Sequence, residues 1–425
     1  MMRYKTFKPP TILGDNIPPT YPLVGIIGKT NVGKSTFFSA ATLVQVKIEN
    51  RPFVTIEPNV GIGYVRTRCA HISFSLSKCM PQNSICLRGI RYVPIKLMDV
   101  AGLVKDAHKG RGLGNQFLDD LRQSDVLLHV IDASGSTDEG GNYVGVGKHD
   151  PIQDIFVIES EIDEWFHSIV SKDWVRFKRS LETVPYDKAL DLLHQKVSGL
   201  SIRREHIVKA LKLAKLDGSK FGAWRDEELR TFSKCLRVVA KPIVVVANKM
   251  DIPESEDNLK RIIKELPDRT VVPVSAEYEL ALRKAAKADL ISYLPGDDKI
   301  SVIKPEALTP RQRDVLRNIG NFIEKFGGTG VQEALNTAVF KVLNMIAVYP
   351  VEDVNKLIDS KGNILPDTYL VPKGSTALDL AHMIHTDLGR GFLYAVLAKD
   401  KKRVGSDYVL SDGDVVKVVS TLAHG

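Results

Sequence analysis

Short, continuous apolar runs recur between residues 23 and 277, separated by longer stretches with helical spacing. Each run has the length of one strand and little polar alternation, which is typical of strands buried on both faces of a parallel sheet. Weaker strand patterns occupy Val60–Val65 and Ile72–Leu76. This alternation of strands and helices predicts an α/β fold with a doubly wound sheet. The apolar runs lie at residues 23–27, 92–99, 125–133, 238–247 and 270–277.

Residues 152–238 depart from this alternation because their spacing stays helical throughout. Leu190, Leu193 and Val197, for example, repeat every three or four positions. This periodicity predicts an inserted helical arm, such as a pair of antiparallel helices. Trp165, Trp174 and Trp224 all fall near or within this stretch. We expect them to pin the arm to itself, with base stacking as the alternative.

A different pattern begins after helices expected at 309–326 and 331–345. Strands at 347–351 and 368–371 precede a helix at 376–388, and a further strand follows at 415–419. The order of two strands, a helix and further strands predicts a small ubiquitin-like β-grasp domain.

The stretch from Gly28 to Ser35 matches G-x-x-x-x-G-K-[ST], the pattern of a phosphate-binding loop. It lies between the strand at 23–27 and a helix expected at 36–43, which is the context the pattern requires. Backbone N–H groups and the helix N-terminus attract an anion, the lysine reaches phosphate oxygens, and the serine hydroxyl binds Mg²⁺. The residues expected to bind nucleotide here are Gly28, Lys29, Thr30, Asn31, Val32, Gly33, Lys34, Ser35 and Thr36.

Asp99 ends the strand at 92–99 and opens a D-x-x-G pattern that closes at Gly102. Ligands bind at the carboxyl edge of a parallel sheet, so we expect Asp99 to bind Mg²⁺, usually through water. The Gly102 N–H is expected to donate to a γ phosphate. In P-loop GTPases the polar loop after the first helix supplies a threonine to the metal, and Thr55 is the candidate. Lys34, Thr55 and Gly102 are thus candidate catalytic groups.

Asn248-Lys249-Met250-Asp251 follows the run at 238–247 and matches N-K-x-D. A carboxylate at Asp251 can accept hydrogen bonds from the N1–H and the exocyclic amine of guanine. Adenine offers no such donor pair, and an unpaired carboxylate is costly, which favours GTP. Ser275-Ala276, in the loop that ends the run at 270–277, is expected to contact the guanine oxygen.

Leu103 stands where many P-loop GTPases place the glutamine that orients water. The sequence D-x-A-G-L-V, followed by G-x-G-L-G-N-x-F-L, resembles the Obg branch of translation-associated GTPases. Within that branch the resemblance is to the YchF-like group with its archaeal and fungal relatives, from about residue 23 to residue 421. It implies slow hydrolysis of GTP to GDP as a switch in translation. His108 stands in for the glutamine or is an ordinary loop histidine.

The same resemblance bears on ion and base choice. Related glutamine-less GTPases with an asparagine at the position of Asn31 use a bound K⁺, so K⁺ at Asn31 is a hypothesis. Bacterial and eukaryotic YchF-like proteins typically carry Glu where this chain has Asp251 and favour ATP, so the departure favours GTP. The run A-H-M-I-H-T-D-L-G-R-G-F resembles the TGS domain found with Obg-type GTPases and threonyl-tRNA synthetases.

The expected organisation follows from these patterns. Pro-rich residues at the start read as an extended tail, or reflect a start codon placed too early. The expected parts are a tail at 1–20, a P-loop GTPase domain at 21–148 and 238–300, a basic helical arm at 149–237, a helical connector at 301–345 and a TGS domain at 346–425.

The net charge of +8 is concentrated in the arm. Residues 172–237 carry 16 Lys and Arg against 9 Asp and Glu, a net of +7. This asymmetry favours a polyanionic partner such as ribosomal RNA, with an ordinary solvated surface as the alternative. Residues 349–422 carry 9 basic and 10 acidic residues, so the TGS domain is expected to bind a protein. We expect a cytoplasmic monomer, because no apolar run is long enough to span a bilayer.

Cys69, His71, Cys79 and Cys86 lie near one another in the sequence and raise zinc as a hypothesis. Their spacings fit no common zinc pattern, so we interpret them as small buried thiols near a hairpin. The low number of cysteines indicates a reducing compartment.

Three functions remain open on these grounds. The favoured one is a regulatory GTPase with Mg²⁺ and GTP or GDP as ligands. The alternatives are an ATPase of the same fold and a nucleotide-responsive RNA-binding adaptor with negligible turnover.

Overall fold

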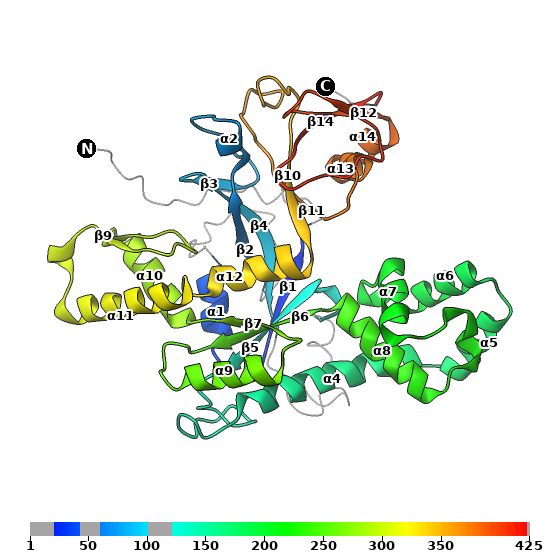
Figure 1. Ribbon diagram of the computed structural model, residues 1–425, viewed down its shortest axis with the longest axis horizontal. Coiled ribbons are helices and arrows are strands. Elements are labelled where there is room, and N and C mark those ends of the chain that lie inside the picture. Colours follow the sequence, from blue (N-terminus) through cyan, green and yellow to red (C-terminus); the bar gives the residue numbers. More distant parts are fainter. Residues whose placement is uncertain (1–20, 43–59, 101–120, 423–425) are drawn as a thin grey trace, which may run out of the picture.

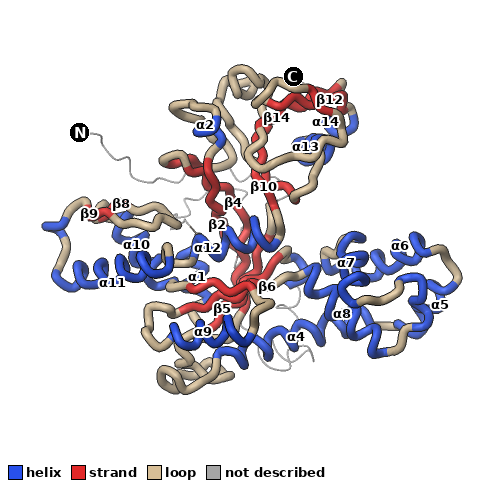
Figure 2. The backbone as a smooth tube through the Cα atoms, viewed as in Figure 1, coloured by secondary structure: helices blue, strands red, loops and turns tan. Residues whose placement is uncertain are grey.

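The protein, described by a computed structural model for residues 21–42, 60–100 and 121–422, consists of a central sheet, a helical arm and a C-terminal sheet domain (Figures 1 and 2). The arm projects to one side of the central sheet, and the C-terminal domain lies beyond β2 and β4 (Figure 1). The predicted α/β fold with a β-grasp domain is confirmed.

The central sheet has the strand order β2-β4-β1-β5-β6-β7, and β3 pairs with β4 at its side. β4, β1, β5, β6 and β7 run parallel, whereas β2 is antiparallel to β4. The carboxyl ends of the parallel strands therefore share one edge, where ligands bind in open α/β sheets. The strands are β1 (Leu23–Ile27), β2 (Val60–Arg68), β3 (Ile85–Leu87), β4 (Ile90–Asp99), β5 (Val126–Asp132), β6 (Ile243–Asn248) and β7 (Thr270–Pro273).

Helices cover both faces of this sheet, which explains the unbroken apolar runs. Val244 and Val246 pack into one layer with α1, α10 and α12, while Val245 and Ala247 pack into the other with α4 and α9. Successive side chains of a strand point to opposite faces, so a strand between two apolar layers needs apolar residues throughout. The helices are α1 (Lys34–Ala41), α4 (Pro151–Ser171), α9 (Ser255–Glu265), α10 (Ala276–Lys287) and α12 (Val331–Asn336).

The arm contains more helices than the expected antiparallel pair. After α4 come α5 (Trp174–Glu182), α6 (Tyr186–Val197), α7 (Arg204–Ala214) and α8 (Asp226–Ala240), joined in part by short 3₁₀ turns at Ser198–Leu200 and Gly218–Ala223. The expectation of two helices was wrong because Pro185, Gly199 and Gly218 divide the helical pattern.

The tryptophans hold the arm together, as predicted. Trp174 and Trp224 stack with ring centroids 6.0 Å apart, and Trp224 also contacts Phe232 at 5.2 Å. All three tryptophans are at most 7 % exposed. Their rings are therefore not accessible for base stacking.

The C-terminal sheet has the order β11-β10-β14-β12-β13, with β10 antiparallel to β11 and parallel to β14. This is the β-grasp arrangement. The predicted helix at 376–388 is divided at His385, whose extended backbone ends α13 and whose ring accepts a hydrogen bond from the Asp387 N–H. The elements are β10 (Met345–Pro350), β11 (Tyr369–Pro372), α13 (Ala377–Ile384), α14 (Thr386–Arg390), β12 (Phe392–Leu397), β13 (Arg403–Val404) and β14 (Val415–Ser420).

The connecting segments largely match their predicted patterns. Thr309 caps α11, as its spacing to Gln312 favours, and α12 continues as a π-helix before β10 begins. The strand expected at Ile72–Leu76 is wrong: the chain forms α2, stabilised by hydrogen bonds such as Phe74 N–H to Ala70 O at 3.1 Å. Alternation alone does not make a strand without a partner. The remaining elements are α2 (Ala70–Ser73), β8 (Ile291–Ser292), β9 (Ser301–Val302), a 3₁₀ turn (Pro305–Ala307), α11 (Pro310–Phe326) and the π-helix (Thr337–Val342).

Across the described ranges, no helix is both long and apolar enough to cross a membrane.

The stacked tryptophans give a testable prediction for the arm. Trp174→Ala removes a ring that is 7 % exposed and should destabilise the arm by about 3–5 kcal/mol. Hydrogen exchange of the amides in α5 to α8 measures this locally, because a multidomain chain need not unfold in one step. Val175→Ala is the control, since Val175 is 67 % exposed. Equal exchange in the two variants would contradict the packing role.

Candidate nucleotide-binding site

The phosphate-binding loop joins β1 to α1 through backbone conformations that its sequence permits. Gly28 and Gly33 have φ of 145° and 94°, and Asn31 has φ of 62°. A Cβ at Gly28 would lie 2.3 Å from the Val130 carbonyl oxygen, and one at Gly33 would lie 2.4 Å from Asn248 Nδ2. Asparagine tolerates the left-handed region better than most residues. The loop geometry therefore accounts for these three residues without reference to a ligand.

Lys34 begins α1 and places its ammonium across the loop. Its Nζ donates to the Lys29 carbonyl oxygen at 2.6 Å. Burial lowers the pKa of the ammonium, and nearby Asp99 offsets part of that shift. A partly desolvated cation attracts phosphate more strongly than one in water.

Ser35 and Asp99 form an oxygen-donor pair suited to Mg²⁺. The Ser35 hydroxyl lies 3.4 Å from Asp99 Oδ2, while Asp99 Oδ1 is buried and has no hydrogen-bond partner among the described residues. Burial raises the pKa of the Asp99 carboxyl, and Lys34 and Ser35 offset part of the increase. An orphaned buried carboxylate oxygen beside a hydroxyl fits a hard cation, which would supply its missing partner.

Asn248 connects the loop with the two segments that are predicted to contact the base. Its Nδ2 donates to the Val32 carbonyl oxygen at 2.9 Å, and its Oδ1 accepts from the Ala276 N–H at 3.1 Å. The side chain is buried. Its single amide thus joins the phosphate loop, the end of β6 and the start of α10.

Asp251 and Lys249 are held beside this junction. Asp251 Oδ1 accepts from the Ser275 hydroxyl at 2.6 Å, and the Tyr278 N–H donates to that same hydroxyl at 3.2 Å. Lys249 Nζ lies 2.8 Å from Asp132 Oδ2. The predicted residues Asn248, Lys249, Asp251, Ser275 and Ala276 are therefore brought together at the carboxyl edge of the sheet, beside the predicted loop.

Three predicted site residues, Thr55, Gly102 and His108, lie outside the described residues, as does Leu103. Their roles remain predictions.

The segment 134–149, which is glycine-rich over residues 134–147, lies between β5 and α4. It folds over the phosphate-binding loop: Thr30 Oγ1 donates to Gly140 O at 2.9 Å, and Asn31 Nδ2 donates to Gly141 O at 2.9 Å. Lys29 Nζ donates to Thr137 O at 2.8 Å. We call residues 134–149 the covering loop.

Asp132 organises the covering loop from the end of β5. Its carboxylate accepts hydrogen bonds from the hydroxyls of Ser134, Ser136 and Thr137 and from Lys249. Burial alone would raise the pKa of Asp132, but the hydrogen bonds from Lys249, Ser134 and Ser136 outweigh it and lower that pKa. The signal in the sequence was an acid at a strand end followed by three hydroxyl residues.

Lys29 is fixed by a second contact of the same region. Its Nζ lies 2.7 Å from Asp154 Oδ2 in the first turn of α4, and both side chains are buried. Asp154 Oδ1 lies 2.9 Å from His149 Nε2. The Lys29 ammonium is therefore held in a buried ion pair, and the nucleotide contact expected of Lys29 stays a prediction.

The sheet order, the phosphate loop and the N-K-x-D junction define a P-loop guanine-nucleotide-binding domain followed by a β-grasp domain. Family profiles agree with this class. The profile described as "50S ribosome-binding GTPase" matches residues 23–160, "Obg-like GTPase YGR210-like, G4 motif-containing domain" matches 246–353, and "TGS domain" matches 359–420.

Relatives extend the match over nearly the whole chain. "Uncharacterized GTP-binding protein MJ1332" of Methanocaldococcus jannaschii is 45% identical, over 94% of this chain and 99% of the relative. "Uncharacterized GTP-binding protein C428.15" of Schizosaccharomyces pombe is 35% identical, over 85% and 90%. The crystal structure of a GTP binding protein from Pyrococcus horikoshii OT3 is 38% identical with a TM-score of 0.74, over 94% and 99%. The chain belongs to the Obg-like, YchF-like family of P-loop GTP-binding proteins.

More distant relatives carry a different name. A protein of Buchnera aphidicola named "Ribosome-binding ATPase YchF" is 27% identical, over 92% of this chain and 97% of the relative.

The covering loop gives a prediction with a matched control. Gly141→Ala would place a methyl group 2.0 Å from Thr30 Oγ1. Relieving that contact should displace the phosphate-binding loop at a cost of about 1–3 kcal/mol, and GTP affinity should fall by about 5- to 150-fold. Binding of a fluorescent GTP analogue measures the change.

Gly147→Ala is the control for backbone strain. Gly147 also has positive φ, at 72°, but no atom of the described residues lies within 4 Å of its added Cβ. We expect that variant to bind GTP as the wild type does. Equal loss of affinity in both variants would mean that strain, not contact with the loop, is responsible.

Proposed function

We propose that this protein hydrolyses GTP to GDP and phosphate and uses the change as a conformational switch at the ribosome. The observation that carries the proposal is the fixed position of the Asp251 carboxylate. One carboxylate oxygen accepts from Ser275 at 2.6 Å, and Asn248 ties the same junction to the phosphate loop. A carboxylate fixed beside the phosphate site is the group that distinguishes guanine from adenine.

The choice of base follows from hydrogen-bond chemistry. Guanine presents two donors, N1–H and the 2-amino group, which a carboxylate can accept together. Adenine lacks this pair, so its binding would leave the Asp251 carboxylate without the two base donors, at a cost of about 1–3 kcal/mol or more. This argument favours GTP over ATP, even though more distant relatives are named ATPases.

Hydrolysis would depend on positioning and charge. Lys34 supplies a cation to the phosphate, and Ser35 with Asp99 would hold Mg²⁺, whose role when bound is to neutralise charge on the phosphate oxygens. Leu103 cannot orient water, so we expect slow turnover. The further candidate catalytic groups are Thr55, Gly102 and His108. Thr55 would bind the metal, the Gly102 N–H would donate to the γ phosphate, and His108 would orient the attacking water.

K⁺ at Asn31 is part of this proposal. Asn31 Nδ2 donates to Gly141 O, so the orientation of the side chain is set by the covering loop and Oδ1 is the atom left to meet a cation. A monovalent cation beside the phosphates would add positive charge where negative charge develops during hydrolysis. This contribution would matter in a protein that has Leu103 in place of the catalytic glutamine. If K⁺ does not stimulate GTP turnover, the alternative function of an RNA-binding adaptor with negligible turnover gains support.

The basic arm is the proposed contact with ribosomal RNA. Arg204 on α7 pairs with Asp187 and Asp191, and Arg203 pairs with Glu205. Lys209, Lys212 and Lys215 of the same region are exposed, and no salt bridge within the described ranges involves them. Unpaired surface cations are the ones that gain most from meeting phosphates. The near-neutral TGS domain is proposed to meet a protein partner, and the protein to act as a cytoplasmic monomer.

A base-exchange experiment tests the proposed specificity. Asp251→Asn should lose GTP affinity by about 100-fold, since the amide cannot accept from both guanine donors. It should gain affinity for XTP, because xanthine carries a carbonyl oxygen in place of the 2-amino group and the amide can donate to it. Competition binding with GTP, XTP and ATP measures all three.

Asp257→Asn is the control for that experiment, because Asp257 lies on α9 and is exposed. It should leave nucleotide preference unchanged. If Asp251→Asn still prefers GTP, or if the wild type binds ATP as tightly as GTP, the proposed base recognition is wrong.

Charge reversal tests the arm. Lys209→Glu with Lys212→Glu should weaken ribosome binding and reduce the slope of log affinity against log salt by about 1–2. The comparison is Lys264→Glu with Lys284→Glu, which changes the net charge equally at exposed positions outside the arm. Sedimentation with ribosomes at several salt concentrations measures both. If both double variants weaken ribosome binding equally, the arm contributes no more to that binding than any other exposed charge.

A further inference from the structure

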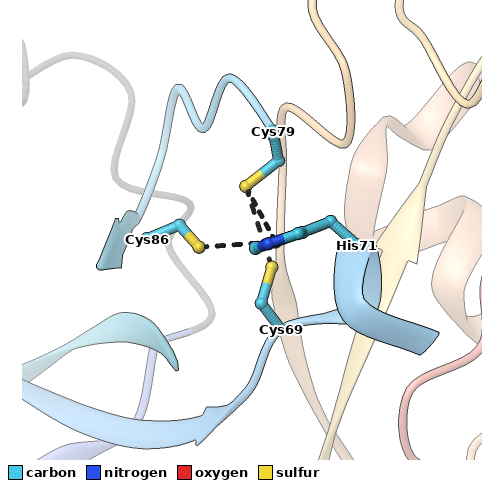
Figure 3. Close-up of side chains that lie close together, drawn as sticks. All are labelled: Cys69, His71, Cys79 and Cys86. Carbon is cyan, nitrogen blue, oxygen red and sulfur yellow. Dashed lines mark hydrogen bonds between the residues drawn. The ribbon is translucent and has the colours of Figure 1, made fainter. Parts of the chain in front are cut away.

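Four metal-binding side chains converge between β2 and β4, away from the nucleotide site. Cys69 follows β2, His71 lies in α2, Cys79 lies in the loop after α2, and Cys86 lies in β3. Their ligand atoms all lie within 4.8 Å of one another. Figure 3 shows the three sulfur atoms and the imidazole pointing into one small space. The fold thus gathers residues whose sequence spacing had argued against a shared site.

Three of the six distances between ligand atoms in this cluster match those of a tetrahedral zinc site. Zinc bonds of about 2.3 Å to sulfur and about 2.0 Å to nitrogen place tetrahedral ligands about 3.8 Å apart for two sulfurs and about 3.5 Å apart for sulfur and nitrogen. Cys69 and Cys79 sulfurs are 3.8 Å apart. His71 Nδ1 lies 3.4 Å from Cys79 Sγ and 3.5 Å from Cys86 Sγ.

Arg91 of β4 supplies the charge that such a centre needs. Three thiolates and one neutral imidazole around Zn²⁺ carry a net charge of −1. The Arg91 side chain is fully buried, and its Nε donates to Cys69 Sγ at 3.3 Å. No salt bridge within the described ranges involves Arg91, so a thiolate centre would be the anion that offsets this buried cation.

The two other nitrogens of the Arg91 guanidinium each donate a hydrogen bond as well. The group donates to Ser84 Oγ at 2.9 Å and to Leu365 O at 3.0 Å, and it lies over the Tyr349 ring. The guanidinium is therefore fixed in place beside the cluster. A fixed hydrogen-bond donor on a ligating sulfur is the usual surrounding of a structural metal site.

A disulfide explains the cluster less well. The Cys69 and Cys79 sulfurs are 3.8 Å apart, nearly twice the length of an S–S bond of about 2.05 Å. A disulfide would also leave one thiol and the imidazole facing it without a role. Four protein ligands and no open position characterise structural rather than catalytic zinc.

We propose that Cys69, His71, Cys79 and Cys86 bind one structural Zn²⁺ that fixes the segment between β2 and β4 as the seat of the C-terminal domain. The residues between the ligands Cys79 and Cys86 carry the contacts that dock this domain. Met80 N–H donates to Ile364 O at 2.8 Å, and Gln82 N–H donates to Pro366 O at 2.7 Å.

A reciprocal pair strengthens this docking. Asn83 Nδ2 donates to Thr368 O at 3.1 Å, and the Thr368 N–H donates to Asn83 Oδ1 at 2.9 Å. Asn83 and Thr368 are both buried. A metal that holds Cys79 and Cys86 would hold this stretch in the conformation that meets the chain before β11.

Metal content of the full-length protein tests the proposal directly. Protein purified under reducing conditions without chelators should contain one zinc per chain by plasma mass spectrometry. Replacement by Co²⁺ should give the visible absorption of a tetrahedral, thiolate-ligated ion. This second readout in the wild type does not depend on whether a cysteine variant folds.

Variants then assign the ligands. Cys79→Ser and Cys86→Ser should each lower zinc content and affinity by tenfold or more, whereas Cys235→Ser on α8 should retain the metal. Removal of zinc should raise hydrogen exchange at residues 79–86 and 364–368 and leave α5 to α8 unchanged.

Four outcomes would count against the proposal. Wild-type protein without metal and with four free thiols after denaturation would leave only a thiol cluster. Fewer than four thiols would indicate a disulfide, and iron in place of zinc would indicate a different centre. Unchanged exchange at 364–368 after loss of zinc would remove the docking role.

Discussion

The side-chain amide of Asn248 is the interaction on which the nucleotide site depends. It donates to Val32 in the phosphate loop and accepts from Ala276 at the start of α10, so one buried group sets the distance between the phosphate end and the base end. Gly33 must lack a Cβ because that atom would meet this amide at 2.4 Å. This junction also determines the positions of its chain neighbours. Lys249 and Asp251 closely follow Asn248, and Ser275 precedes Ala276. Loss of these two hydrogen bonds would therefore disturb the spacing of the site even if every residue predicted to contact the ligand were kept.

Much of this arrangement could be predicted from the sequence, for a physical reason. The phosphate loop and the N-K-x-D stretch each follow a strand buried on both faces, and unbroken apolar runs such as 243–247 identify those strands. Parallel strands end at one edge, so residues that follow them meet even when they are far apart in the chain. The β-grasp domain was predictable from the order of its strands and helix.

Other features depended on contacts that local patterns do not encode. The glycines of the covering loop indicate turns but not the surface on which they land, and Gly141 meets Thr30 only in the folded chain. The Cys69 to Cys86 cluster forms because β2 and β3 both pair with β4, which brings the two ends of that segment together. Spacing along the chain carries no record of that pairing. Likewise, the loop pattern that includes Lys29 does not indicate that its ammonium meets Asp154, on a helix beyond the covering loop.

We propose that a fixed Asp251, with Leu103 in place of the glutamine that orients water, makes this protein a slow, guanine-specific hydrolase. Phosphate release from GTP and from ATP by the wild-type protein, in KCl and in NaCl at equal ionic strength, tests it most directly. The account predicts measurable turnover of GTP that is faster in KCl, with ATP turned over at least tenfold more slowly. Turnover of ATP equal to or faster than that of GTP would contradict it, and so would background rates in every condition.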